Sequence, residues 1–445
     1  MAIVNNIFGW ALKKRIHQIE LFIKYPQEVQ REFLLNLTAN ASKTSWGENY
    51  NYSSINRIRE FEERVPISSY EDIYPYIQQL MAGEKNVLWP GKVSWFAKSS
   101  GTTNAKSKFI PVTPEALEEC HYKGGKDMLS LYFNNYGQRG LFDGKSLTIG
   151  GSHQINPLNP RSKYGDVSAV IMQNLPLWAK VVKTPSMKVA LMENWEEKIE
   201  AMAIETEKEN VTNMAGVPTW TLLLLQRILE RNNTSSILDI WPNLELFVHG
   251  AVSFQPYKAL FKQLIPSNQM NYQEVYTASE GFFGIQDQPG TEDMLLMLDY
   301  GVYYEFIPMD SYGKEAEGTV RLEEVKLNQN YAMVISTNAG LWRYKIGDTI
   351  KFTSLTPFKI KISGRTKHFI NAFGEELIVE NADIAIKHAA EKTDSLISNY
   401  SAAPIYFEGK EKGGHEWLIA FEKEPNDLEL FTYHLDQKLK EVNSD

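Results

Sequence analysis

The chain is poor in cysteine and has no long apolar run. Its one cysteine, Cys120, cannot form an internal disulfide or a cysteine-rich zinc site, and a lone cysteine of this kind is usually a half-buried helix residue rather than a nucleophile. The longest apolar stretch, residues 220–225, is far shorter than the roughly 18 residues of a membrane helix. Residues 13–15 carry positive charge after the N-terminal apolar residues, the reverse of a secretory signal. We therefore expect a cytoplasmic enzyme or binding protein.

Positive charge is also scarce. The formal net charge is −9, from 46 basic and 55 acidic residues, and no long basic run contains interleaved aromatic residues. Because binding to a nucleic acid backbone needs a concentrated positive surface, we do not expect nucleic acid as a partner, and any anion site must be local. We do not expect a membrane partner either, because the apolar stretches are too short. The eight histidines have no metal-ligand spacing, and no nucleophile elbow is present, since Thr277 occupies the glycine position of the nearest candidate.

Apolar periodicity predicts an α/β fold with a large sheet or β-barrel-like region and a small α+β domain at the end. Helices are expected at 12–41 with a break near Pro26, at 114–135, 191–208, 219–229, 380–393 and 427–441, the one at 219–229 being buried on several sides. Strands are expected on both sides of residues 99–108, at LELFVH, EVYT, DMLLML, GVYYEFIP, GTVRLEEV, YAMVIST, DTIKF and PFKIKIS between 244 and 363, and at PIYFEG and HEWLIAFE. The segment ISGRTK is the expected boundary between the domains.

The loop SSGTTNAKSK, residues 99–108, is rich in hydroxyl groups and lies between two expected strands. Position 106 is lysine where a P-loop would have its second glycine, so the helix-leading P-loop is excluded. Two interpretations stay open: an ordinary solvated turn, or a loop that turns N–H, O–H and lysine groups toward a polyphosphate. The phosphate contacts would come from Ser99, Ser100, Gly101, Thr102, Thr103 and Lys108, with Lys106 a weaker candidate.

A second cluster is VYTASEGFFG, residues 275–284. Tyr276 could stack on a flat base, Thr277 and Ser279 add hydroxyl groups, and Glu280 could hold Mg²⁺, which prefers oxygen ligands. The alternative is a strand end followed by a capped helix start.

A third cluster is LWRYKIGDTIKF, residues 341–352, in which Arg343, Lys345 and Asp348 surround Gly347. We expect a strand, a glycine turn and a second strand. Asp348 could accept the hydroxyl groups of a ribose, as acidic residues do in dinucleotide-binding folds. An aspartate in a simple turn is the alternative.

In this order, the three clusters resemble the motifs of the adenylate-forming superfamily, and most closely those of its Gretchen Hagen (auxin-responsive) acyl acid amido synthetase family. Further segments are similar to that family: VPISSYEDIYPYIQQLMAGE at 65–84, GVPTW at 216–220, HGAVSFQPYKALF at 249–261 and SGRTKHFINAFGEEL at 363–377. The resemblance covers nearly the whole chain.

The resemblance implies a large N-terminal ATP- and acyl-binding domain, residues 1–363, and a small mobile C-terminal domain, residues 364–445. ATP and Mg²⁺ would be used to activate a small carboxylic acid as an acyl adenylate, which an amino acid amine then converts to an amide. By resemblance, the adenine site would be formed by Tyr276 with Gly250, Ala251 and Val252, Asp348 would hold the ribose, Glu280 the Mg²⁺, and Arg365 and Lys367 would reach ribose or phosphate from the hinge.

The resemblance is weakest at the C-terminal end. Nothing after Phe431 matches the late catalytic lysine of the superfamily, and the family pattern continues beyond KEVNSD. We therefore expect either a C-terminal domain that is incomplete at its end or a different second half-reaction. Two rival functions are an acid–thiol ligase that makes an acyl-CoA and a non-catalytic nucleotide- or acyl-binding protein. The acyl pocket is expected near the helix after GVPTW and the aromatic residues at 172–178.

Overall fold

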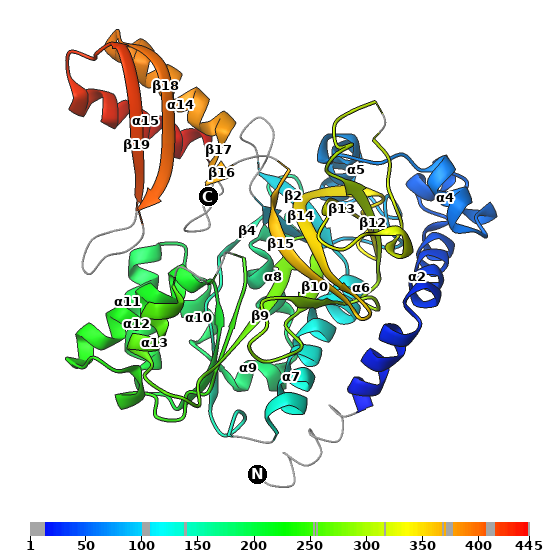
Figure 1. The fold of residues 1–445 in the computed structure, drawn as a ribbon, viewed down its shortest axis with the longest axis horizontal. Coiled ribbons are helices and arrows are strands. Elements are labelled where there is room, and N and C mark those ends of the chain that lie inside the picture. Colours follow the sequence, from blue (N-terminus) through cyan, green and yellow to red (C-terminus); the bar gives the residue numbers. More distant parts are fainter. Residues whose placement is uncertain are drawn as a thin grey trace. The chain divides into compact units, whose positions relative to one another are not determined.

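The protein divides into two compact units. A computed structural model describes residues 14–99, 107–137, 140–251, 254, 257–315, 317–366, 369–370, 377–405 and 414–443. The larger unit comprises Met1–Lys98 and Phe109–Gly364, and the smaller comprises Ser99–Lys108 and Arg365–Asp445. In Figure 1 the chain is coloured from blue at its N-terminus to red at its C-terminus. No helix among the described residues has the length and apolar character needed to cross a bilayer.

The first helices confirm the predicted break near Pro26. Residues 14–24 are helical, and α2 (Pro26–Ala41) starts with that proline in its first turn, where the missing N–H has no helical partner to lose. The preceding helix is anchored by Arg15, whose guanidinium binds Asp127 at 2.6 Å and Asp299 at 2.7 Å. The next helices are α3 (Ser45–Asn49), α4 (Ile58–Arg64) and α5 (Tyr70–Ala82).

An eleven-stranded sheet organises the large unit, with strand order β12-β13-β14-β15-β11-β10-β9-β8-β7-β3-β6. Strands β3, β6, β7, β8 and β9 pair in parallel. The pairs β9–β10, β10–β11, β11–β15, β13–β14 and β12–β13 are antiparallel. The strands are β3 (Lys145–Thr148), β6 (Lys183–Thr184), β7 (Val211–Gly216), β8 (Leu246–His249), β9 (Asn271–Ala278), β10 (Gly281–Ile285), β11 (Met294–Leu296), β12 (Val302–Pro308), β13 (Asn330–Thr337), β14 (Tyr344–Leu355) and β15 (Phe358–Arg365). The predicted strand region of 244–363 is therefore largely confirmed.

One predicted strand is wrong. The segment GTVRLEEV, residues 318–325, alternates like a strand, but only Val320 makes a β-bridge, with Phe306, and residues Leu322–Glu324 form a 3₁₀-helix. The physical reason is a local cap: the backbone N–H of Arg321 donates to the carboxylate of Glu324 at 2.8 Å, which favours a helical turn over continued pairing.

A second sheet of four described strands has the order β2-β1-β5-β4. Its strands are β1 (Trp95–Ser99), β2 (Lys108–Val112), β4 (His153–Ile155) and β5 (Lys163–Gly165). The strands on both sides of the hydroxyl-rich loop are thus confirmed. Helices follow at α6 (Pro114–Ala116), a π-helical segment Leu117–Tyr122, α7 (Lys123–Tyr136), α8 (Val167–Asn174), α9 (Leu177–Val181) and α10 (Met187–Ala190).

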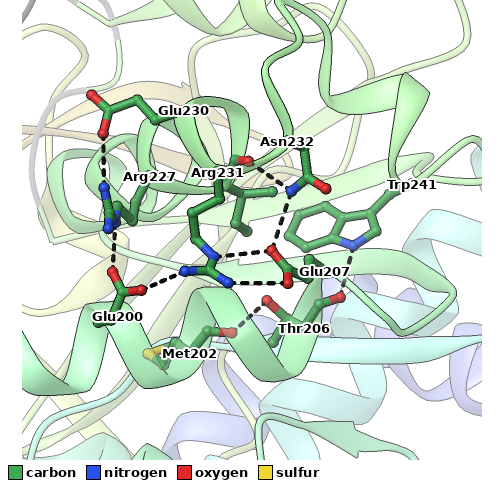
Figure 2. A network of polar contacts seen from close by, with 10 residues as sticks. Glu200, Met202, Thr206, Glu207, Arg227, Glu230, Arg231, Asn232 and Trp241 are labelled. Carbon is green, nitrogen blue, oxygen red and sulfur yellow. Dashed lines mark hydrogen bonds and ion pairs between the residues drawn. The ribbon is translucent and has the colours of Figure 1, made fainter.

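The parallel strands are covered by α11 (Trp195–Thr206), α12 (Pro218–Asn232) and α13 (Lys258–Leu264). Their shared core contains Leu147 and Phe247 from the sheet and Leu225 and Ile228 from α12. The prediction for 219–229 holds for the apolar positions, but the C-terminal half of α12 also has a polar edge. Figure 2 shows Arg231 bound to Glu200 and Glu207 of the α11 segment at 2.5 and 3.1 Å, which ties the two helices together.

The only cysteine is a core residue. The Cys120 Sγ accepts the backbone N–H of Phe282 at 3.1 Å, and burial raises the pKa of the thiol to about 12. This agrees with the structural role expected for a lone helix cysteine, because an activated thiol has a lowered pKa.

In the smaller unit, α14 (Val379–Thr393) and α15 (Leu428–Val442) accompany the antiparallel pair β18 (Leu396–Ile405) and β19 (Gly414–Lys423). Short strands β16 (Phe369–Ile370) and β17 (Leu377–Ile378) precede them. A small core forms around Ala385, Ile386 and Phe431. The α+β character is as predicted, although β18 begins eight positions before PIYFEG, whose last residues lie outside the described part.

Candidate active site

Tyr276 and Asp348 come together although they lie on distant strands. The Tyr276 hydroxyl on β9 donates to Oδ2 of Asp348 on β14 at 2.5 Å, and both residues are buried. Three strands separate β9 from β14 in the sheet order, which would place them roughly 19 Å apart if the sheet were flat. The sheet therefore curves back on itself here, as the predicted barrel-like region requires, and brings the second and third motifs into one site.

The sequence predicts that Asp348 lies in a glycine turn between two strands, and this prediction is wrong. Tyr344–Leu355 is one continuous strand, and Gly347 takes a positive φ of 97° inside it. The pairing of β13 with β14 shifts register at this point, which indicates a β-bulge. The bulge turns the strand locally, so Asp348 faces the Tyr276 hydroxyl without a chain reversal.

Arg343 has a structural role in the motif. Its guanidinium binds both carboxylate oxygens of Glu305, at 3.0 and 2.8 Å, and both side chains are buried. The same group donates to the backbone carbonyls of Glu62 and Val65 at 2.9 and 2.7 Å. The guanidinium therefore makes its hydrogen bonds within the protein. Lys345 likewise binds Glu317 at 3.1 Å, so Asp348 is the residue of this cluster that meets Tyr276.

Glu280 occupies a tight two-residue turn. Ala278 pairs with Gly281, so Ser279 and Glu280 connect β9 to β10, and the alternative of a helix start after the strand is wrong. Glu280 is 8% exposed. Thr277 and Ser279 are half-buried beside it.

Tyr70 is a residue near this turn that the sequence analysis did not single out. Its hydroxyl accepts the backbone N–H of Phe109 at 2.8 Å, at the start of the strand after the hydroxyl-rich loop. Burial raises the pKa of Tyr70, and the negative charges of Glu71 and Glu280 add to the effect. The segment VPISSYEDIYPYIQQLMAGE was the available signal, but nothing in it marks this tyrosine.

Gly250 and Ala251 follow directly after β8, at the carboxyl end of a parallel strand. A Cβ at Gly250 would come within 2.4 Å of the Val275 carbonyl oxygen, so only glycine permits this approach to β9. Ala251 has a positive φ of 70°. The close contact sets this turn beside the residue that precedes Tyr276, as expected for two parts of one adenine site. Val252 lies outside the described residues.

The hydroxyl-rich loop is described only at its ends. Ser99 is the last residue of β1 and Lys108 the first residue of β2, where it is buried. Ser100, Gly101, Thr102, Thr103 and Lys106 lie outside the described residues. Arg365 ends β15, and Lys367 is also outside the described part.

The carboxyl ends of β7 and β8 carry buried polar atoms. Thr219 Oγ1, just after β7, and His249 Nδ1, at the end of β8, have no hydrogen-bond partner in the part of the chain that the structure describes. Burial lowers the pKa of His249 to about 3, and Lys258 adds to the effect, so the imidazole is neutral. Such atoms in a native fold usually face a ligand or ordered water. Open α/β sheets bind ligands at this edge, where the strand order reverses, and here it reverses around β3.

Two family models cover most of the chain. The GH3 family N-terminal domain matches residues 15–270, and the GH3 family central domain matches residues 295–365. The chain belongs to the GH3 family. This membership confirms the resemblance that the three motifs had indicated.

Relatives within the GH3 family are distant in sequence. Indole-3-acetic acid-amido synthetase GH3.4 of Arabidopsis thaliana is 24% identical over 404 residues, which cover 76% of this chain and 67% of that protein. The 4-substituted benzoates-glutamate ligase GH3.12 of the same plant is 26% identical over 365 residues, which cover 66% of this chain and 60% of that protein.

Solved structures confirm the fold. AtGH3.15 acyl acid amido synthetase in complex with 2,4-DB has a TM-score of 0.69 at 16% identity, covering 98% of this chain and 85% of that one. A 2-hydroxyisobutyryl-CoA ligase in complex with 2-HIB-AMP and CoA has a TM-score of 0.59 at 13% identity, covering 95% of this chain and 85% of that one. The fold of this GH3 chain is therefore that of adenylate-forming enzymes, and it is shared by amide- and thioester-forming proteins.

Proposed function

We propose that this chain is an ATP-dependent acyl acid amido synthetase, which activates a small carboxylic acid as an acyl adenylate and transfers it to an amino acid. Membership of the GH3 family carries the proposal, because relatives in it are named as amido synthetases and as a benzoate–glutamate ligase. The bond between Tyr276 and Asp348 supports it, since it unites the motifs expected to hold adenine and ribose.

The nucleoside of ATP would lie at the ends of β8 and β9, beside the bulge of β14. Tyr276 would pack on adenine beside the Gly250 turn, and the Asp348 carboxylate, which accepts a hydrogen bond from Tyr276, would bind the ribose hydroxyls. By the family resemblance, the phosphates would be held by Ser99, Ser100, Gly101, Thr102, Thr103 and Lys108, Thr277 and Ser279 would add contacts to the nucleotide, and Arg365 and Lys367 would reach ribose or phosphate.

Glu280 fits a magnesium ion that is held jointly with ATP. No group of three metal-ligating side chains occurs among the described residues, which argues against a cage made by the protein alone. Mg²⁺ is commonly bound through one or two carboxylates, waters and substrate phosphates, and the buried Glu280 offers one such carboxylate. When bound, the ion would neutralise phosphate charge.

The chemistry needs alignment and charge neutralisation more than a covalent protein nucleophile. An oxygen of the acid attacks the α-phosphorus of ATP, and the bond to the bridging oxygen breaks to release pyrophosphate. The amine nitrogen then attacks the acyl carbon, AMP departs with its oxygen, and the nitrogen loses a proton to give the amide. Lys108 would balance the phosphate charge of the first step.

The acid would bind at the carboxyl ends of β3, β7 and β8. Thr219 and His249 present their unpaired buried atoms there, and the neutral imidazole leaves the site without added positive charge. A third group, the Lys198 ammonium, holds the Gly150 carbonyl of the loop after β3 and so shapes the same edge. The aromatic side chain of Trp178, part of the predicted pocket, lies outside the described side chains.

We further propose that residues 364–445 act as a mobile domain that docks differently in the two half-reactions. The hinge begins at Gly364, whose φ of 146° is a conformation reserved for glycine. This proposal rests on the family resemblance and on the compactness of the smaller unit. The cytoplasmic location likewise stays a prediction from the sequence.

Product analysis tests the function. Purified protein is incubated with ATP, Mg²⁺ and a panel of acyl acids, and each acid is offered amino acids in one reaction and coenzyme A in another. We expect amide with release of AMP and pyrophosphate, and loss of ATP–pyrophosphate exchange in Asp348→Ala. Thioester as the sole product would establish the acid–thiol ligase instead. Absence of exchange across the whole panel would favour a non-catalytic binding protein.

A further inference from the structure

A cavity of about 260 Å³ lies beside α2, and none of the residues assigned to ATP or the acid lines it. Its walls come from the first two turns of α2, the start of α4 at Ile58, strand β12 at Tyr303, and the segment around Arg321 and Leu322. Pockets for drug-sized ligands have volumes of about 300–1,000 Å³, so this one suits a smaller metabolite.

Tyr303 gives the cavity a buried hydrogen-bonding group. The residue is 3% exposed, and its hydroxyl has no hydrogen-bond partner within the described part of the chain. Its ring packs edge-to-face on Phe61 with centroids 6.3 Å apart, which fixes its direction. Burial raises its pKa, and the charges of Glu305, Glu62 and Arg321 act on it too. A buried hydroxyl left unpaired in a native fold calls for a ligand or water.

The wall carries two cationic and two anionic side chains. Arg31 and Glu28 project from α2, and Arg321 and Glu323 from the segment opposite. Among the described residues, Arg31, Glu28 and Glu323 form no ion pair, and Arg321 keeps its Nη1 without an acceptor. The charge of Arg321 is already met by Glu62, so Arg31, Glu28 and Glu323 carry the wall charges that have no counter-ion among the described residues. A zwitterion offers one group to each sign of charge.

The cavity is also held in shape before any ligand binds. Arg321 donates Nε and Nη2 to the two carboxylate oxygens of Glu62 at 2.7 and 2.6 Å. The backbone carbonyl of Glu62 accepts from Arg343 at 2.9 Å on its other side. Because this wall is preorganised, a ligand does not have to order it.

We propose that this cavity binds a free amino acid as its zwitterion. Arg31, the Nη1 of Arg321 and the Tyr303 hydroxyl supply donors for the carboxylate, and Glu28 and Glu323 accept from the ammonium. Ile58 and Leu322 provide an apolar surface for the side chain. None of the residues proposed for ATP, Mg²⁺ or the acid lines this site, and its existence does not depend on the synthetase activity.

Calorimetric titration of the full chain tests the site, with L-leucine, L-phenylalanine and L-glutamate as separate probes and neither ATP nor acyl acid present. We expect saturable binding of at least one probe below roughly 10 mM, weakened about fivefold or more by Tyr303→Phe and by Arg31→Ala. Arg161→Ala, which removes an exposed arginine elsewhere, and Asp348→Asn, which alters the catalytic motif, should leave binding unchanged.

Several results would overturn the proposal. These are the absence of binding by all three probes, binding that survives both cavity variants, and binding lost through Asp348→Asn, which would place the amino acid in the catalytic site. Equal binding of N-acetyl-L-leucine amide, which lacks both charges, would contradict the zwitterion. Thermal unfolding of each variant, compared with the parent, confirms that the folded protein is being titrated.

Discussion

The Tyr276 hydroxyl and the Asp348 carboxylate are joined by a 2.5 Å hydrogen bond across 72 positions of sequence. The bond sets the spacing between the residue proposed for adenine and the residue proposed for ribose. Both side chains are buried, so neither is free to reorient when the nucleotide arrives. The nucleoside site is therefore preorganised by the curvature of the sheet.

Tyr276→Phe removes this bond and keeps the ring. We expect the KM for ATP in ATP–pyrophosphate exchange to rise about tenfold, because a hydrogen bond to a charged group contributes about 1.5–3 kcal/mol. Tyr331→Phe is the matched control, since the Tyr331 hydroxyl contacts Gln329 and the Lys326 backbone instead. An unchanged KM in Tyr276→Phe would separate the bond from nucleotide binding.

Glu280→Gln tests the magnesium proposal by removing charge without changing shape. We expect the exchange rate to fall about 100-fold and the Mg²⁺ concentration for half-maximal rate to rise, since the amide is a poorer ligand for a hard cation. Titration of MgCl₂ at fixed ATP measures both. Glu118→Gln, at an exposed position, should match the parent. A magnesium dependence identical to the parent's would remove Glu280 from the metal site.

Arg343→Ala should act on stability. The substitution leaves Glu305 buried without its counter-charge and leaves the Glu62 and Val65 carbonyls without a donor. We expect a loss of about 3–5 kcal/mol in the free energy of unfolding, measured by urea denaturation. Arg59→Ala, which breaks an exposed pair with Glu63, should cost less than about 1 kcal/mol. Equal losses in the two variants would show that the Arg343 pair is not structural.

We expect Lys183 to make the free energy of unfolding depend on pH. Its ammonium donates to Ser146 and Thr148 at 3.1 and 2.9 Å, and burial lowers its pKa to about 8. Between pH 8 and the ordinary lysine value near 10.4, the unfolded chain holds a proton that the folded protein has lost, so stability rises with pH in this window.

The comparison with Lys183→Met isolates that effect. The free energy of unfolding of the parent minus that of the variant should be constant below pH 8 and increase above it, by at most about 1.4 kcal/mol per pH unit. Lys198, whose pKa is also lowered to about 8, is present in both proteins and cancels. Lys188→Met, at an exposed site, should give a flat difference. A flat difference for Lys183→Met as well would contradict the lowered pKa.

Gly364→Ala tests the hinge. Alanine does not adopt a φ of 146° without strain, so the variant should favour another backbone conformation at the domain boundary. We expect amide turnover to fall about tenfold while the KM for ATP changes less than about twofold. Gly290→Ala is the control, since Gly290 also has a positive φ, of 76°, and has open space around it. Parallel loss of ATP binding in Gly364→Ala would point to a local role instead.

Local sequence patterns predicted where helices and strands lie better than they predicted what single residues do. The break at Pro26 and the strands on both sides of residues 99–108 follow from proline geometry and from short apolar runs, which depend on nearby residues only. Gly347 was read as a turn because glycine usually marks one, whereas pairing with β13 keeps the strand continuous through a bulge.

The features that the sequence did not predict depend on contacts between residues that are far apart in the chain. Arg343 was grouped with Asp348 by proximity in sequence, but its partner Glu305 is 38 positions away and could not be identified from spacing. Tyr70 gains its place near Glu280 only through the fold. The cavity beside α2 has the same origin, because Arg31 and Arg321 become neighbours only when α2 packs beside β12.

Because the Cys120 thiol is buried, fluorescent dyes can be attached to cysteines introduced on each unit without replacing Cys120. With its pKa raised to about 12, the native cysteine is almost entirely in the unreactive protonated form at neutral pH, and its burial excludes a maleimide dye. Arg161→Cys on the larger unit and Tyr433→Cys on the smaller would then carry the dyes, both at exposed positions. Energy transfer between them could follow hinge rotation during turnover with the natural cysteine left in place.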